Sequence, residues 1–130
     1  MTKLYVDTNI YLEFIEQRRN YNDVVAFFVT VQQKNFKIVV SDWVLEELYK
    51  FTDEHAMSNL FKELKDYIIH VSYSEKDKQD ARELSPNNWQ DALHAVIAKK
   101  EGANYIISIN KRDFLEFRSL VEPKFPSEFF

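Results

Sequence analysis

The stretch LYVDTN, residues 4–9, decides the fold, because a short apolar run ends in an acid that is followed at once by helix-favouring sequence. Its first three residues favour a buried strand. The pair Thr8-Asn9 offers side chains that cap helices, and apolar residues recur at helical spacing as far as Ile15. The stretch therefore predicts a strand that turns directly into a helix, with Asp7 at the end of the strand.

The same alternation continues along the chain and predicts an α/β fold. Further strands are predicted over 36–40, 67–73 and 104–109, with a candidate edge strand near 119–121. Helices are predicted between them, over residues 21–34, 41–49, 55–66, 74–84 and 89–100. Strands separated by helices imply crossover connections, and hence a mostly parallel sheet that is covered on both faces.

Length and composition indicate one domain spanning residues 1–130. The 20 aromatic residues (11 Phe, 7 Tyr and 2 Trp) and the modest net charge of -4 argue against disorder. No apolar run approaches the roughly 18 residues of a membrane span, and the first residues lack the apolar core of a signal peptide. We therefore expect a soluble, cytoplasmic protein.

Two scarce residue types exclude several function classes. The chain has no Cys, which rules out disulfides, thiolate zinc sites and a cysteine nucleophile. Its single glycine is Gly102, whereas phosphate-binding loops of nucleotide-binding folds need several glycines. Gly102 instead is placed to end the helix over 89–100.

Acidic and amide side chains recur where the predicted strands end or in the helices that follow them. They are Asp7, Glu46, Glu47, Asp91, Asn110 and Asp113. Each has an ordinary structural interpretation, as a helix cap, a solvated helix residue or a turn residue. In a parallel α/β sheet, however, the carboxyl ends of the central strands meet at one crevice. Carboxylates gathered there repel one another unless a cation lies among them, and oxygen ligands suit Mg²⁺ or Mn²⁺.

Four segments together resemble the sequence blocks of PIN-domain nucleases, in the family's order. They are VDTN (6–9), Ser41 with VLEEL (44–48), DALHA (91–95) and SINKRDF (108–114). The resemblance spans essentially the whole chain. It implies a three-layer α/β/α fold with about five mostly parallel strands, and metal-dependent cleavage of RNA. Among small single-domain members the chain resembles the VapC-like toxins of type II toxin-antitoxin pairs, which implies an antitoxin partner and a homodimer.

The resemblance also implies which residues act. Carried over position by position, the three acids are Asp7, Glu47 and Asp91; Glu47 is preferred to Glu46 because the family's acid is typically followed by Leu. The fourth acidic position falls on Asn110, a neutral ligand, so either Asp113 three residues later supplies the charge or a second ion binds weakly. These five residues are the expected metal ligands for one or two ions.

The supporting residues keep two interpretations each. Thr8, Asn9 and Ser108 either support the site or make turn and cap hydrogen bonds. Lys111 and Arg112 are candidates for RNA contacts, with a solvated surface role as the alternative. Tyr11 and Trp43 either stack on bases or pack in the core, and His94 is assigned a packing or hydrogen-bonding role.

Two other functions compete with the nuclease. The neutral Asn110 is compatible with a non-catalytic PIN-like module that binds protein or RNA through an incomplete metal site. Phosphoryl transfer through an aspartyl phosphate at Asp7 is disfavoured, because that chemistry usually needs a second acid two residues on and the position holds Asn9.

Overall fold

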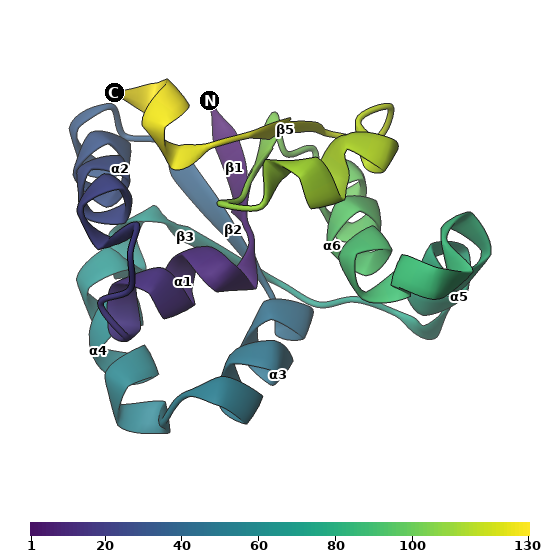
Figure 1. Ribbon diagram of the computed structural model, residues 1–130, viewed down its shortest axis with the longest axis horizontal. Coiled ribbons are helices and arrows are strands. Elements are labelled where there is room, and N and C mark those ends of the chain that lie inside the picture. The colour runs from purple at the N-terminus through teal and green to yellow at the C-terminus, as the bar shows by residue number, and fades with distance from the viewer.

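The computed structural model describes residues 1–130, and its five strands form a single, all-parallel sheet in the order β3-β2-β1-β4-β5 (Figure 1). The strands are β1 (Lys3–Val6), β2 (Lys37–Ser41), β3 (Ile68–Val71), β4 (Tyr105–Ile107) and β5 (Glu122–Lys124). The predicted α/β class with a parallel sheet of about five strands is therefore confirmed.

Six α-helices and four short 3₁₀ helices connect the strands. The α-helices are α1 (Thr8–Ile15), α2 (Tyr21–Gln33), α3 (Asp42–Phe51), α4 (Glu54–Leu64), α5 (Glu75–Leu84) and α6 (Trp89–Lys100). The 3₁₀ helices are η1 (Lys65–Tyr67), η2 (Pro86–Asn88), η3 (Lys111–Phe117) and η4 (Pro126–Phe129). None of the helices is long and apolar enough to cross a bilayer.

The strand order explains how the helices form two layers around the sheet. The chain moves from β1 to β2 to β3 in one direction, so right-handed crossovers place α1 to α4 on one face. It then crosses to the other side of β1, which places α5, α6 and η3 on the opposite face, where α6 packs against both α5 and η3. Figure 1 shows the two helix groups on either side of the strands, with both termini at one end of the molecule.

This reversal of direction lies between β1 and β4, and it is the switch point at which open α/β sheets form their crevice. The register pairs Val6 with Ile107, so Asp7 and Ser108 follow the two strands at the same level. The backbone N–H of Asp7 donates to the carbonyl of Ile107 at 2.9 Å. The fold therefore places the residue after each central strand side by side.

Three helix ends agree with the predicted ranges. Ser41 caps α3 by accepting a hydrogen bond from the backbone N–H of Val44 at 3.2 Å, and Ser74 begins α5 with a capping box. Gly102 follows α6 with φ of +72°, a conformation that glycine adopts without a steric penalty.

The edge strand predicted near 119–121 is wrong by about three residues, because it forms over Glu122–Lys124. The backbone N–H groups of Leu120 and Val121 both bond to the carbonyl of Phe117, which makes this segment a turn. Val121 is buried, so its apolar character reflects core packing rather than strand pairing. The core itself is one cluster of 30 buried apolar residues between the sheet and its helices.

Candidate active site

Asp7 is the most buried acid of the crevice, with 4% of its surface exposed at the carboxyl end of β1. Its carboxylate makes no capping hydrogen bond to α1, so the cap interpretation is wrong. Instead Ser108 donates its hydroxyl to Oδ2 of Asp7 at 3.1 Å. Burial raises the pKa of Asp7; the nearby positive charge of His94 opposes this, and the charge of Glu47 adds to it.

Glu47, on α3, faces Asp7, whereas its neighbour Glu46 faces away and accepts a hydrogen bond from Tyr73. Adjacent residues on a helix point about 100° apart, so only one of the pair can turn toward the crevice. Oε1 of Glu47 accepts hydrogen bonds from Thr8 Oγ1 at 2.6 Å and from His94 at 2.7 Å. Burial disfavours ionised Glu47, but His94 and Thr8 together hold its pKa below the ordinary value.

His94 lies between these two carboxylates and is 1% exposed. Its Nε2 lies 2.7 Å from Glu47 Oε1 and 3.8 Å from Asp7 Oδ1. On the other side of the ring, Nδ1 lies 2.7 Å from the Tyr5 hydroxyl, which in turn lies 2.7 Å from Ser41 Oγ. Burial favours the neutral imidazole, yet Glu47, Asp7 and Asp91 outweigh it and raise the pKa of His94.

The hydrogen-bonding role expected for His94 is thus observed. The sequence patterns did not predict its contact with Glu47, nor the hydrogen bonds by which Tyr5 and Ser41 support it. The only signal for Tyr5 in the sequence is a hydroxyl on an otherwise apolar buried strand. That signal does not identify the partner, because Ser41 and His94 lie 36 and 89 residues away.

Asp91 enters the crevice from α6 and is partly buried. Asn88, the residue before α6, makes no side-chain cap, so the cap interpretation does not account for Asp91. The pKa of Asp91 is raised to about 6, first by burial and then by the charge of Asp7, while His94 opposes the shift and Asp113 and Glu47 add to it. The structure therefore brings Asp7, Glu47 and Asp91 together from three different elements.

The two remaining predicted ligands lie on the loop after β4. The backbone N–H of Asn110 donates to Ser108 Oγ at 2.9 Å, and its side chain is exposed. Asp113 is also exposed, but it lies close enough to raise the pKa of Asp91. Both therefore border the crevice rather than fill it.

The supporting residues divide between the crevice and its rim. Thr8 contacts Glu47 and Ser108 contacts Asp7, whereas Asn9 is half-buried and makes no side-chain hydrogen bond. Lys111 pairs with Glu128 at 3.3 Å, and Arg112 is exposed without an ion pair.

The two aromatic residues considered for base stacking both lie in the core. Tyr11 is 0% exposed and Trp43 is 6% exposed. Trp43 packs against Trp89 and Tyr73. The stacking interpretation is therefore wrong for both.

The residues at the crevice suit a hard divalent cation by chemistry and by charge. They offer carboxylate and hydroxyl oxygens. Burial is the main cause of the raised pKa values of Asp7 and Asp91, and neighbouring carboxylates add to it, so a bound cation would favour their ionised forms. No three of the chain's Asp, Glu and His side chains form a ready metal-binding group. His94 and Thr8 both hydrogen-bond to Glu47 Oε1. Asp7, Glu47 and Asp91 are the residues whose oxygens would hold such an ion.

Comparisons with known proteins agree with this arrangement. Residues 3–112 match the family model described as "PIN domain". The chain is 25% identical over 119 residues to "Ribonuclease VapC1" of Aquifex aeolicus, covering 84% of this chain and 82% of the relative.

Two solved structures share the fold. VapBC2 from Rickettsia felis, bound to a DNA fragment from its promoter, matches with a TM-score of 0.61 and 22% identity over 95% of this chain and 98% of that one. FitAB bound to IR36 DNA matches with a TM-score of 0.63 and 13% identity over 95% of each chain. With a family match over most of its length, the four sequence blocks in order and the acids gathered at the switch point of the sheet, this chain belongs to the PIN domain family.

Proposed function

We propose that this chain is a metal-dependent endoribonuclease that hydrolyses RNA phosphodiester bonds with Mg²⁺ or Mn²⁺ in a single domain, residues 1–130. The observation that carries the proposal is the convergence of Asp7, Glu47 and Asp91 on one crevice at the carboxyl ends of β1 and β4. The distant similarity to a ribonuclease supports RNA as the substrate. PIN nucleases generally use Mg²⁺ or Mn²⁺, which fits this donor set.

Each residue of the crevice has a separate task in this proposal. Asp7, Glu47 and Asp91 hold the ion, with Asn110 and Asp113 as further oxygen donors on the open side. Ser108 fixes the Asp7 carboxylate, and Thr8 with His94 fixes that of Glu47. A bound divalent ion supplies water activation and neutralises the charge that develops on the phosphate. The attacking group is water, so no protein nucleophile is required. Lys111 and Arg112 contact the RNA backbone.

The decisive experiment measures cleavage of a single-stranded RNA by the purified chain in Mn²⁺. We expect activity that EDTA removes and that Asp7→Asn reduces at least a hundredfold. Asp23→Asn, a change at an exposed carboxylate in the first turn of α2, serves as the matched control and should cleave normally. Cleavage that survives both EDTA and Asp7→Asn would show that another site or a contaminant is responsible.

A non-catalytic PIN-like module remains the second candidate function. Asn110 stands where the family's fourth acid is expected, and the crevice contains no ready three-residue metal group. This alternative predicts RNA or protein binding that is unchanged by Asp7→Asn, with no cleavage of any RNA in Mn²⁺. The experiment above therefore separates the two functions.

We further propose that the chain is the cytoplasmic, homodimeric toxin of a toxin-antitoxin pair. Both similar solved structures are complexes, VapBC2 and FitAB. The candidate surface for an antitoxin is a cavity of about 520 Å³ between α1, α2 and α4, which is lined mainly by apolar side chains and bordered by Val29, 45% exposed. The test is co-expression with a small protein encoded next to this chain. Co-purification that Val29→Asp abolishes supports the proposal, and a monomer with no such partner contradicts it.

A further inference from the structure

A pocket lies beside the acids on the β5 side of the sheet. Its volume is about 360 Å³, within the range of about 300 to 1,000 Å³ that is typical of ligand sites. It is lined by Ile109, Asn110, Lys111, Arg112, Asp113 and Phe125. We refer to these six residues as the Phe125 pocket.

Ser108 connects this pocket to the acids through two hydrogen bonds. Its hydroxyl donates to Asp7, and its backbone N–H donates to the carbonyl of Lys124 at 3.0 Å. Phe125 follows Lys124 directly and so lies at the level of the β4 carboxyl end. Asn110 lines the pocket, and its backbone N–H donates to the same Ser108 hydroxyl that holds Asp7, so the pocket lies next to this acid.

Phe125 is an exposed aromatic residue whose backbone is held in place. Its exposure is 41%, and no other aromatic ring packs against it. Its backbone N–H donates to Glu128 Oε2 at 2.7 Å, which fixes the start of η4. Buried Pro126 follows it and anchors the chain on the other side. The ring is therefore presented to solvent by a rigid backbone rather than by a loose terminus.

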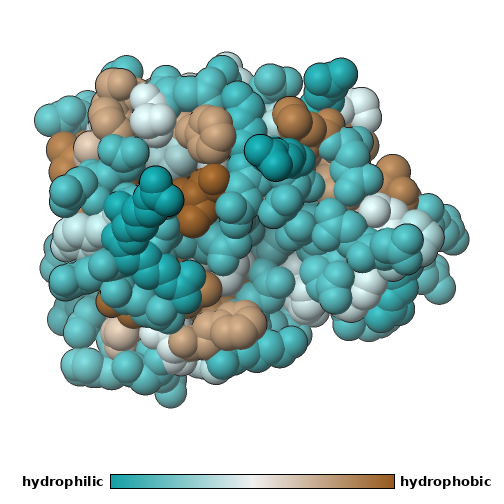
Figure 2. All heavy atoms as spheres, in the orientation of Figure 1, coloured by the Kyte–Doolittle hydropathy of each residue, from teal (hydrophilic) through white to brown (hydrophobic).

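Lys111 and Arg112 supply two positive charges to the pocket, and Asp113 supplies one negative charge, in a protein whose net charge is -4. Lys111 Nζ lies 5.3 Å from the Phe125 ring centroid and 3.3 Å from Glu128 Oε2, so one acid positions both the ring and the ammonium group. Arg112 is exposed, and no carboxylate of the chain pairs with it. In the view of Figure 2, hydrophilic residues cover most of the visible surface of the molecule, and the hydrophobic ones form separate groups.

We propose that the Phe125 pocket is a nucleobase subsite, in which one base of a single-stranded RNA stacks on Phe125 while Lys111 and Arg112 contact the adjoining phosphates. The inference rests on the proposed nuclease function and names the substrate as unpaired RNA. A base in a duplex is already stacked on its neighbours and cannot lie against the ring, whereas a single strand presents its bases freely. A base held here places a neighbouring phosphodiester over Asp7 and Asp91.

The test measures binding separately from cleavage. A fluorescently labelled single-stranded RNA of mixed sequence is titrated with the Asp7→Asn protein in Mg²⁺, in which cleavage is disabled. Base stacking on an aromatic side chain corresponds to a loss of roughly ten- to a hundredfold in affinity when the ring is removed. We therefore expect Phe125→Ala to weaken binding by that factor, and Phe125→Trp to bind at least as well as the unmodified pocket.

Phe130→Ala is the matched control, since Phe130 is also an exposed phenylalanine but does not line the pocket. It should bind normally, and a duplex RNA should bind equally to all variants. In the active protein, Phe125→Ala should raise KM with little change in kcat. Circular dichroism shows whether each variant is folded, and retained binding by Phe125→Trp distinguishes loss of stacking from loss of structure.

Different results overturn the two proposals. If Phe125→Ala binds single-stranded RNA as well as the unmodified pocket, or if the unmodified pocket does not bind it, the subsite proposal is wrong even when the protein cleaves RNA. If binding depends on Phe125 while no RNA is cleaved in Mn²⁺, the subsite stands and the nuclease proposal fails.

Discussion

Asp91→Asn should make the metal-free protein more stable while it abolishes cleavage. The pKa of Asp91 lies at about 6 against an ordinary 3.8, because the carboxylate is partly buried beside Asp7. One pKa unit is worth about 1.4 kcal/mol, so the ionised carboxylate costs the fold at most about 3 kcal/mol at pH 7. Solvent screening of the exposed part reduces this to about 1 to 2 kcal/mol. An amide of the same shape removes that cost.

The assay is thermal unfolding in EDTA, followed by circular dichroism between pH 4.5 and 7.5. A stabilisation of this size corresponds to a melting temperature roughly 3 to 8 °C higher for Asp91→Asn at pH 7. The sign of the pH dependence follows from the raised pKa. Folded Asp91 takes up a proton at a higher pH than unfolded Asp91, so the stability of the unmodified protein rises as the pH falls from 7 through 6 toward 4. The difference between the two proteins should therefore shrink on acidification.

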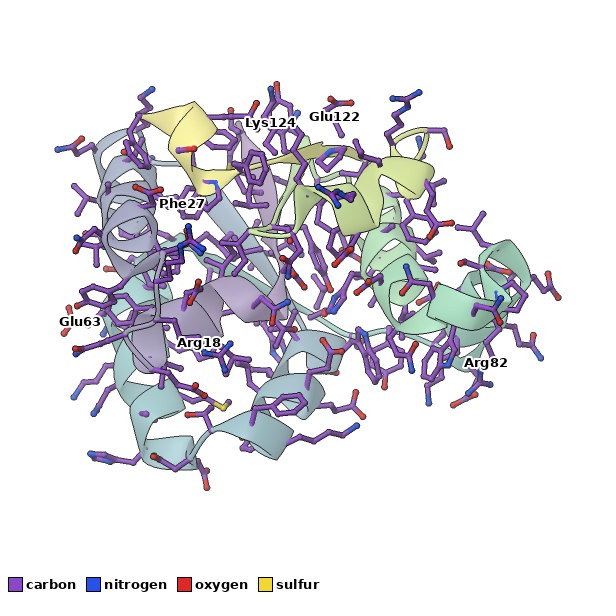
Figure 3. All side chains as sticks on the ribbon, viewed as in Figure 1. Arg18, Phe27, Glu63, Arg82, Glu122 and Lys124 are labelled. Atoms are coloured by element: carbon purple, nitrogen blue, oxygen red, sulfur yellow. The ribbon has the colours of Figure 1, made fainter.

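Glu122→Gln is the matched control, because Glu122 is an exposed carboxylate on β5 that lies at the edge of the molecule and makes no ion pair (Figure 3). It should leave the melting temperature unchanged. Adding Mn²⁺ should stabilise the unmodified protein and have a much smaller effect on Asp91→Asn. The reasoning is refuted if Asp91→Asn melts at or below the temperature of the unmodified protein in EDTA at pH 7.

Three further predictions concern single contacts. Ser108→Ala removes the hydroxyl that donates to Asp7 and accepts from the Asn110 N–H. It should lower kcat about tenfold and reduce the free energy of unfolding, measured in urea, by about 1 to 2 kcal/mol. An unchanged kcat would show that Asp7 needs no such support. Tyr5→Phe leaves His94 Nδ1 without its partner in a buried site. It should lower the free energy of unfolding by about 1 to 3 kcal/mol in the same assay. An unchanged urea midpoint would mean that water replaces the hydroxyl. Gly102→Ala should lower the free energy of unfolding by about 1 kcal/mol. The loss comes from the φ of +72° alone, because an added Cβ meets nothing within 4 Å. The measurement is the melting temperature, and a rise would contradict the strain argument.

Local sequence patterns predicted most of the fold. Alternation of apolar runs with capping residues located β1, β2 and β4 and the helices between them, because these signals act over a few residues of chain. Gly102 marked the end of α6 for the same reason, and the helices predicted over 41–49 and 74–84 start at the residues that cap them. The edge strand β5 was misplaced because its three residues include Pro123 and two charged residues, and their pairing depends on β4 rather than on their own strand propensity.

The order of four sequence blocks predicted the PIN family, and the preference for Glu47 over Glu46 agrees with the side chain that faces the crevice. The assignment of the five site residues as metal ligands stays a prediction. The sequence did not reveal that His94 lies between Glu47 and Asp7, that Tyr5 and Ser41 support it, or that Phe125 lies beside the acids.

The sequence by itself thus determined the strands, the helices and the residue types available for chemistry, since propensity and capping depend on neighbours along the chain. Only the tertiary structure decided which polar atoms meet. The partners of Asp7 and His94 are separated by as many as 101 residues, and they are brought together by strand order and helix rotation. Those two properties are set by packing the whole core at once, so no short stretch of sequence specifies them.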